Sequence, residues 1–195
     1  LYANFPHFQQ TTTISGLIGE GVGGVTEILK RRIVLPLGAS LADTDHVIGH
    51  ELVHAFQYDI TALEHSSFAR IQSGVNRLPL WLIEGMAEYL SIGAVDPHTS
   101  MWMRDAARRK KLPTTKQLTN PRYFPYRYGQ SLWAYITGKW GDRAIPRIIK
   151  TAGRTGNYEI AIQRALGVSM KELTESWHES LKNTYEPVLN KTWVP

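Results

Sequence analysis

The 195-residue sequence contains no cysteine, which excludes disulfide bonds and thiolate metal ligands. It also has no apolar run long enough to cross a membrane, so we expect no membrane span. It begins without methionine and without a signal peptide, and we therefore expect it to be a piece of a longer protein. Hydrophobic residues make up 43% of the chain, which is typical of a folded globular domain.

The formal net charge is +5, but the basic residues are scattered except for the run Arg108–Lys111. No aromatic residues interleave with basic ones in a nucleic-acid motif, so we expect no nucleic-acid partner. A basic domain that binds acidic surfaces is an alternative, and salt-dependent binding to heparin or nucleic acid would support it.

The most informative stretch is His50-Glu-Leu-Val-His54. In an α-helix, His50 and His54 lie one turn apart on the same face, where both ring nitrogens can bind one Zn²⁺. Glu51 stands about 100° around the helix and can take a proton from water activated by the metal. We expect the opposite face, which carries Leu52 and Phe56, to be packed. Three fixed positions are a weak pattern, so the motif needs a third ligand.

A second amphipathic segment, Trp81–Leu90, offers that ligand. Glu84 completes a His₂Glu set and leaves the fourth metal position open, as a catalytic zinc requires. Glu88, one turn later, can accept a hydrogen bond from the other ring nitrogen of a ligand histidine. The alternative is a pair of surface glutamates, but two like charges on an otherwise apolar helix are unfavourable without a cation.

These two motifs together resemble the gluzincin metallopeptidases, whose third zinc ligand is a glutamate. They are most similar to the peptidase MA-like domains of secreted proteins that carry TolB-like β-propeller repeats. The resemblance implies one Zn²⁺ per chain, a peptide or protein substrate, and a secreted, periplasmic or cell-envelope location. It also implies a covalently linked β-propeller domain in the full-length protein.

Two features bear on this assignment. The metzincin pattern needs Gly and His where this chain has Gln57 and Ile60. The interval between His54 and Glu84, 29 residues, is longer than is usual in gluzincins, so we expect 61–80 to loop out between the two helices.

The fold that we expect is α+β: a thermolysin-like zincin in which a small N-terminal β-sheet lies over the zinc-binding helix and a mostly helical lobe follows. We expect a single domain over 1–195, with lobes at 1–95 and 96–195. Strands are predicted at 11–14, 25–29 and 32–37, and the resemblance implies that 32–37 is the edge strand lining the cleft. Helices are predicted at 45–59, 81–90, 100–111, 130–140, 143–151, 158–166 and 169–185.

The segment Tyr126-Arg-Tyr-Gly129 resembles the Tyr-x-x-Gly motif of aminopeptidase-like gluzincins. The match implies that Tyr126 stabilises the oxyanion in the transition state, with Tyr128 as the fallback. Simple aromatic packing is the alternative for both. The aminopeptidase Gly-x-Met-Glu-Asn motif is matched only at Gly24 and Glu27, so we assign no exopeptidase function.

The other histidines are expected to be structural: His7, His46, His65, His98 and His178. For His46, a contact near the metal site is the less favoured alternative. The sequence thus predicts a zinc-dependent metallopeptidase. The competing hypothesis is a catalytically inactive, peptidase-like interaction module. Glu51 argues against it, because a structural zinc needs no base and normally has four protein ligands.

Overall fold

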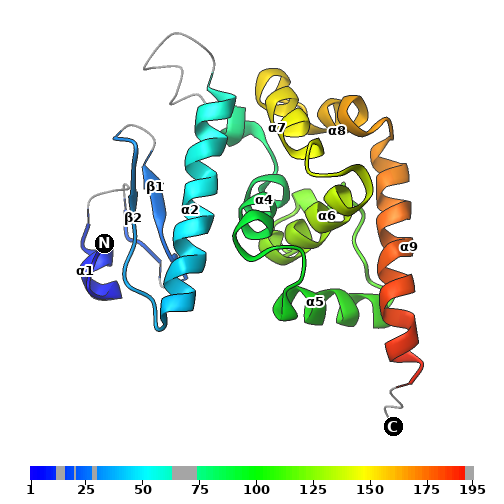
Figure 1. The fold of residues 1–195 in the computed structure, drawn as a ribbon, viewed down its shortest axis with the longest axis horizontal. Helices are drawn as coiled ribbons and strands as arrows, with labels where there is room; N and C mark the ends of the chain where they lie inside the picture. Colours follow the sequence, from blue (N-terminus) through cyan, green and yellow to red (C-terminus); the bar gives the residue numbers. More distant parts are fainter. Residues whose placement is uncertain (12–15, 20, 28–29, 63–73, 192–195) are drawn as a thin grey trace.

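A computed structural model describes residues 1–11, 16–19, 21–27, 30–62 and 74–191 (Figure 1). The structure is mostly helical with one small antiparallel sheet, in agreement with the predicted α+β class. None of its helices is both long and apolar enough to span a membrane within these ranges. In chain order, the elements are α1 (Phe5–Gln9), β1 (Val25–Glu27), β2 (Arg32–Val34), α2 (Leu41–Thr61), the 3₁₀ helix η1 (Gly74–Arg77), α4 (Leu80–Ile92), α5 (Pro97–Arg108), η2 (Gln117–Thr119), α6 (Pro125–Trp140), α7 (Ala144–Thr155), α8 (Tyr158–Leu166) and α9 (Met170–Leu189).

Local capping explains where several helices begin and end. Helix α2 starts four residues earlier than predicted because the Ser40 side chain accepts a hydrogen bond from the Asp43 N–H. Helix α5 starts at Pro97 rather than residue 100 because Asp96 caps it in the same way. Helix α8 matches its predicted bounds and ends at Gly167, whose φ of +74° favours glycine.

The sheet consists of β1 and β2, with Thr26 paired to Ile33. Strand β1 lies between β2 and helix α2 (Figure 1). Beyond β2, the segment 35–37 pairs with the N-terminus: the Tyr2 N–H donates to Leu35 O at 2.9 Å, and the Leu37 N–H donates to Tyr2 O at 2.8 Å. Most of the strand predicted at 11–14 lies outside the described residues, as do positions 28 and 29.

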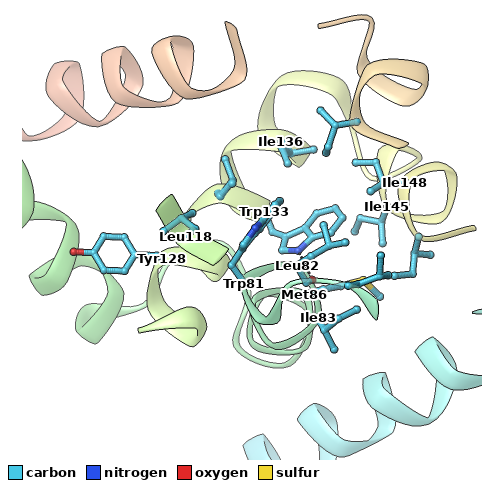
Figure 2. Packing of buried hydrophobic residues seen from close by; sticks show 14 of the residues in the cluster. Trp81, Leu82, Ile83, Met86, Leu118, Tyr128, Trp133, Ile136, Ile145 and Ile148 are labelled. Carbon is cyan, nitrogen blue, oxygen red and sulfur yellow. Dashed lines mark hydrogen bonds between the residues drawn. The ribbon is translucent and has the colours of Figure 1, made fainter. Parts of the chain in front are cut away.

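The main hydrophobic core joins residues of α2, α4, α6, α7, α8 and α9, and Trp81, Trp133 and Trp177 are fully buried. Figure 2 shows Trp81 and Trp133 among their neighbours. The indole N–H of Trp133 donates to Leu82 O at 2.9 Å, so this large side chain is buried with its polar atom satisfied. A smaller cluster around Phe8 lies on the β side. The division of the chain into lobes at residue 95 stays a prediction.

Helices α4 and α6 cross in direct backbone contact at two glycines. A Cβ atom at Gly85 would lie 2.3 Å from the Cα of Gly129, and a Cβ at Gly129 would lie 2.3 Å from the carbonyl oxygen of Trp81. No other residue fits at either position without moving a helix. The crossing brings the first turn of α6, with Tyr126, next to Glu84 on α4.

The prediction that Leu52 and Phe56 are packed is wrong. Their exposed fractions are 44% and 62%, whereas His50, Glu51 and Gln57 on the same helix are buried. Helix α2 therefore turns a polar face toward α4. A surface helix usually buries its apolar side chains and exposes its polar ones, and α2 does the reverse at these positions. Burying the polar side chains is physically reasonable only if they form hydrogen bonds or ion pairs with one another.

Replacing Gly129 with alanine should destabilise the protein by about 2 kcal/mol or more, because overpacking against α4 outweighs alanine's helix propensity. Gly138→Ala, on the same helix, is the matched control, since a Cβ there meets nothing within 4 Å. It should be stabilising by about 0.5–1 kcal/mol. Urea denaturation of both variants tests the crossing, and equal stability of the two would contradict it.

Candidate metal centre

Two helices bring three potential ligand atoms together. The Nε2 atoms of His50 and His54, one turn apart on α2, are 3.0 Å from each other. Each lies 3.2 Å from Oε2 of Glu84 on α4. In tetrahedral coordination with bonds of 2.0–2.1 Å, neighbouring ligand atoms are about 3.3 Å apart. The triangle therefore has nearly the size that a zinc-like ion requires.

The opposite ring nitrogen of each histidine is already hydrogen-bonded. Nδ1 of His50 lies 3.0 Å from Oε1 of Glu88, and Nδ1 of His54 lies 2.8 Å from Oε1 of Gln57. The Gln57 amide is oriented because its Nε2 donates to Ile83 O at 2.9 Å. Both Nδ1 atoms must therefore carry protons.

This arrangement leaves the Nε2 lone pairs of neutral His50 and His54 pointing at each other and at the Glu84 carboxylate. Three acceptors that converge at 3.0–3.2 Å repel one another unless a cation stands between them. A proton or a divalent metal ion satisfies that need, so the donor set fits a metal.

A chain of charged side chains extends outward from Glu88. His46 Nε2 lies 3.0 Å from Glu88 Oε1, and Arg127 Nη1 donates to Glu88 Oε2 at 2.9 Å and to Asp96 Oδ2 at 3.2 Å. His46 is partly exposed, as expected, but it also contacts Glu88 beside the ligands, which was the less favoured alternative. His46, His50 and Glu88 could also hold a metal. We favour the set with Glu84, because Arg127 already supplies a cation to Glu88.

The pKa values follow from this crowding. Burial opposes the charged imidazolium of His50, but the hydrogen bonds that its ring donates to the Glu84 and Glu88 carboxylates raise its pKa to about 9. Burial alone would raise the carboxyl pKa values. Hydrogen bonds and the charge of the histidines instead lower the pKa of Glu84 to about 2, and His46, His50 and Arg127 do the same for Glu88.

Glu51 is buried beside the ligands, at 6% exposure, and is positioned by strand β1. The Thr26 hydroxyl lies 2.6 Å from Glu51 Oε2 and 2.9 Å from Glu51 O, to both of which it can donate. Gly24 makes room for the side chain, since a Cβ there would lie 2.8 Å from Glu51 Cγ. Glu27, the second residue of the partial aminopeptidase motif, pairs with Lys30 and Arg32.

The two candidate tyrosines lie in different surroundings. The Tyr126 ring stacks on His50, with centroids 5.8 Å apart, and burial together with the charge of and hydrogen bond to Glu84 raises its pKa above the ordinary range. Tyr128 is 7% exposed and packs edge-on against Trp102 and Tyr123. Of these two tyrosines, Tyr126 but not Tyr128 shares the cavity with the three ligand residues.

These residues line a cavity of about 770 Å³. One wall is the glycine-rich segment 21–24 with Val25 and Thr26 of β1; α2, α4 and the start of α6 form the others. The expectation that 32–37 lines the cleft is wrong. Strand β1 lies between β2 and α2, so β1 and the residues before it take that place.

The comparison with known families agrees with this geometry. The family model BSP, described as "Peptidase of plants and bacteria", matches residues 36–179. The chain belongs to this family. It is therefore a peptidase-family domain, and this membership indicates a protein or peptide as the substrate class. Neither the curated proteins nor the solved structures gave a match.

The sequence did not reveal four residues of the site of this family member. Gln57 bears on the sequence pattern only as the residue that excludes a metzincin, and Arg127 lies inside the Tyr-x-x-Gly motif without a role of its own. Asp96 carries no sequence signal for its contact with Arg127. Thr26 left no signal, because its contact with Glu51 joins residues 25 positions apart.

Replacing Gln57 with methionine should weaken metal binding about 10- to 100-fold, because His54 loses the partner that fixes its tautomer. Gln163→Met, on the exposed face of α8, is the control and should bind metal like the wild type. Competition with a chelator measures both affinities. An unchanged affinity in Gln57→Met would show that the amide does not orient His54.

The metal-free protein should be most stable between about pH 4.5 and 6.5. The raised pKa of His50 contributes stability below 6.5 that is lost as the pH rises through 9. The lowered pKa values of Glu84 and Glu88 contribute stability above 4.5 that is lost as the pH falls through 2.

Denaturant unfolding at a series of pH values, in the presence of a chelator, measures this profile. Glu84→Gln is the comparison variant: it removes one carboxylate beside His50 and should weaken the loss of stability above pH 6.5. A wild-type profile that is flat from pH 6.5 to 9 would contradict the assignment.

Proposed function

We propose that this domain is a zinc-dependent metallopeptidase of gluzincin type. The observation that carries the proposal is the convergence of His50, His54 and Glu84, whose lone pairs all point to one place between them. Among the described residues, three protein ligands meet there, which leaves a fourth position for water or substrate, as in catalytic zinc sites. Zinc bound to this set would act as a Lewis acid that makes water nucleophilic near neutral pH and polarises a peptide carbonyl.

Glu51 is suited to be the general base. Its carboxylate borders the same cavity, and the hydrogen bond from Thr26 restricts its orientation. Thr26 leaves lone pairs on both carboxylate oxygens free to accept a proton from the attacking water. Glu51 would then pass that proton to the nitrogen of the departing amine.

Tyr126 is suited to stabilise the oxyanion. Its hydroxyl stays protonated near neutral pH, because burial and the charge of Glu84 oppose the phenolate. A protonated phenol can donate a hydrogen bond to the charge that develops on the carbonyl oxygen. The stacking of Tyr126 on His50 keeps the ring at the ligand triangle.

The resemblance to peptidase MA-like domains extends the proposal to the whole protein. It supports a secreted, periplasmic or cell-envelope location and a β-propeller on the same polypeptide. The second hypothesis, an inactive interaction module, keeps the metal but not the reaction. The buried position of Glu51 beside the ligands favours the enzyme.

Metal analysis by mass spectrometry and cleavage of a peptide library, run on the same samples, test the proposal. Wild type, Glu51→Gln and Tyr126→Phe should each hold about one zinc, and Glu84→Ala much less. Cleavage should fall about 10²- to 10⁴-fold in Glu51→Gln and about 10²- to 10³-fold in Tyr126→Phe.

Tyr128→Phe is the matched control for Tyr126→Phe, since it removes a hydroxyl outside the cavity, and its cleavage rate should match the wild type. Stoichiometric zinc without cleavage of any peptide would favour the interaction module. Absence of zinc after reconstitution would contradict the whole proposal.

A further inference from the structure

The exposed face of helix α7 carries a row of cations: Arg143 just before the helix, then Arg147, Lys150 and Arg154. At 3.6 residues per turn these positions fall within a sector of about 60°. The opposite face is apolar, and Ile145 and Ile148 point into the main core (Figure 2). The packing of α7 thus holds the four cations on one line directed away from the core.

This row lines an open groove of about 750 Å³. Arg164 of α8 adds a fifth cation, and Trp140, Pro146 and Ala165 supply apolar surface. The groove contains no acidic residue among its lining side chains.

The five cations are not neutralised within the protein. None of them makes an ion pair or hydrogen bond in the part of the chain that the structure describes. The groove thus combines five cations with no acidic residue in its lining, which gives it a strongly positive local charge.

We propose that this groove is an exosite that binds an extended, acidic segment of a polypeptide, and this inference rests on the proposed peptidase function. Alternate side chains of an extended peptide point to the same side at intervals of about 6.7 Å. The cations on α7 recur about once per turn, every 5.4 Å or so. The two repeats differ by about 1.3 Å per step, which long arginine and lysine side chains can take up, so glutamate or aspartate at every second position can follow the row. The guanidinium groups of the arginines can bind these carboxylates in bidentate geometry.

The shape of the surface favours a single chain over other polyanions. The cations form one row in a concave groove between two helices, whereas a lipid bilayer presents a flat surface. A nucleic-acid site would require aromatic side chains along the strand for base stacking, and Trp140 is the one aromatic residue in the lining. Trp140 is already contacted by the Lys139 ammonium at 4.8 Å and by the Tyr135 ring.

The groove lies away from the metal centre. Tyr126 and Trp140 mark the two sites on helix α6, and 14 residues of helix separate them by about 21 Å along the axis. An extended peptide covers that distance with about seven residues. A substrate with an acidic segment at least that far from the scissile bond could occupy both sites.

Binding is tested without cleavage, on the Glu51→Gln background. The probe is a fluorescein-labelled 12-residue peptide of alternating Glu and Ala, followed by fluorescence anisotropy at low salt. We expect Arg147→Glu, Lys150→Glu and Arg154→Glu together to weaken binding at least about tenfold. The matched control reverses three charges elsewhere, Arg104→Glu, Arg108→Glu and Lys111→Glu, and should weaken it much less. A triple glutamine variant at 147, 150 and 154 serves if charge reversal impairs folding.

Equal binding by the groove variant and the control, or equal binding of a Gln-Ala peptide, would overturn the proposal. So would groove-dependent binding of heparin, single-stranded DNA or anionic vesicles without binding of the acidic peptide. In the zinc-loaded wild-type background, the groove variant should cleave a short neutral peptide normally and a peptide with a distant acidic segment less efficiently. If the wild type cleaves peptides but the Glu51→Gln protein with an intact groove does not bind the acidic peptide, only the exosite is rejected. If that protein binds the acidic peptide through the groove but the zinc-loaded wild type cleaves no peptide, only the peptidase is rejected.

Discussion

The backbone contact between α4 and α6 is the constraint on which the site depends. Because Gly85 and Gly129 have no side chains, the two helices approach until backbone meets backbone. Glu84, which directly precedes Gly85, then faces α2, and Tyr126 stands one turn before Gly129. A wider crossing would separate the tyrosine and Arg127 from the carboxylates. The glycine of the Tyr-x-x-Gly motif is thus explained by packing, independently of any catalytic role.

The polar interior of this crossing is stable only as a connected set. His50, His54 and Glu84 need a cation among them, and each histidine has a partner on its far side. Arg127 closes the outer end of the set by bridging Glu88 and Asp96. This explains why α2 buries histidine, glutamate and glutamine while Leu52 and Phe56 remain exposed. The same burial that makes an isolated charge costly fixes the orientation of every ligand side chain.

Helix α6 runs between two surfaces of opposite charge. Its first turn enters the cavity of the metal centre, which is rich in carboxylates, and its last residue, Trp140, borders the basic groove. A polypeptide that spans both would meet cations about 21 Å from the reacting bond. Selection of substrates would then depend in part on charge far from the bond that is cut.

The sequence by itself determined the features that depend on short spacings along the chain. It predicted most helices, the pairing of His50 with His54, and Glu84 as the third member of the set. Helical periodicity places residues i and i+4 on the same face, and two glutamates on an otherwise apolar helix require a cation.

Tertiary structure alone decided that β1 rather than 32–37 lines the cavity, that Gln57 orients His54, and that Tyr126 rather than Tyr128 faces the ligands. It also gathered Arg164 with the row on α7. These contacts join residues far apart in the chain, such as Thr26 with Glu51 or Glu88 with Arg127, and such pairs leave no periodic signal in a single sequence.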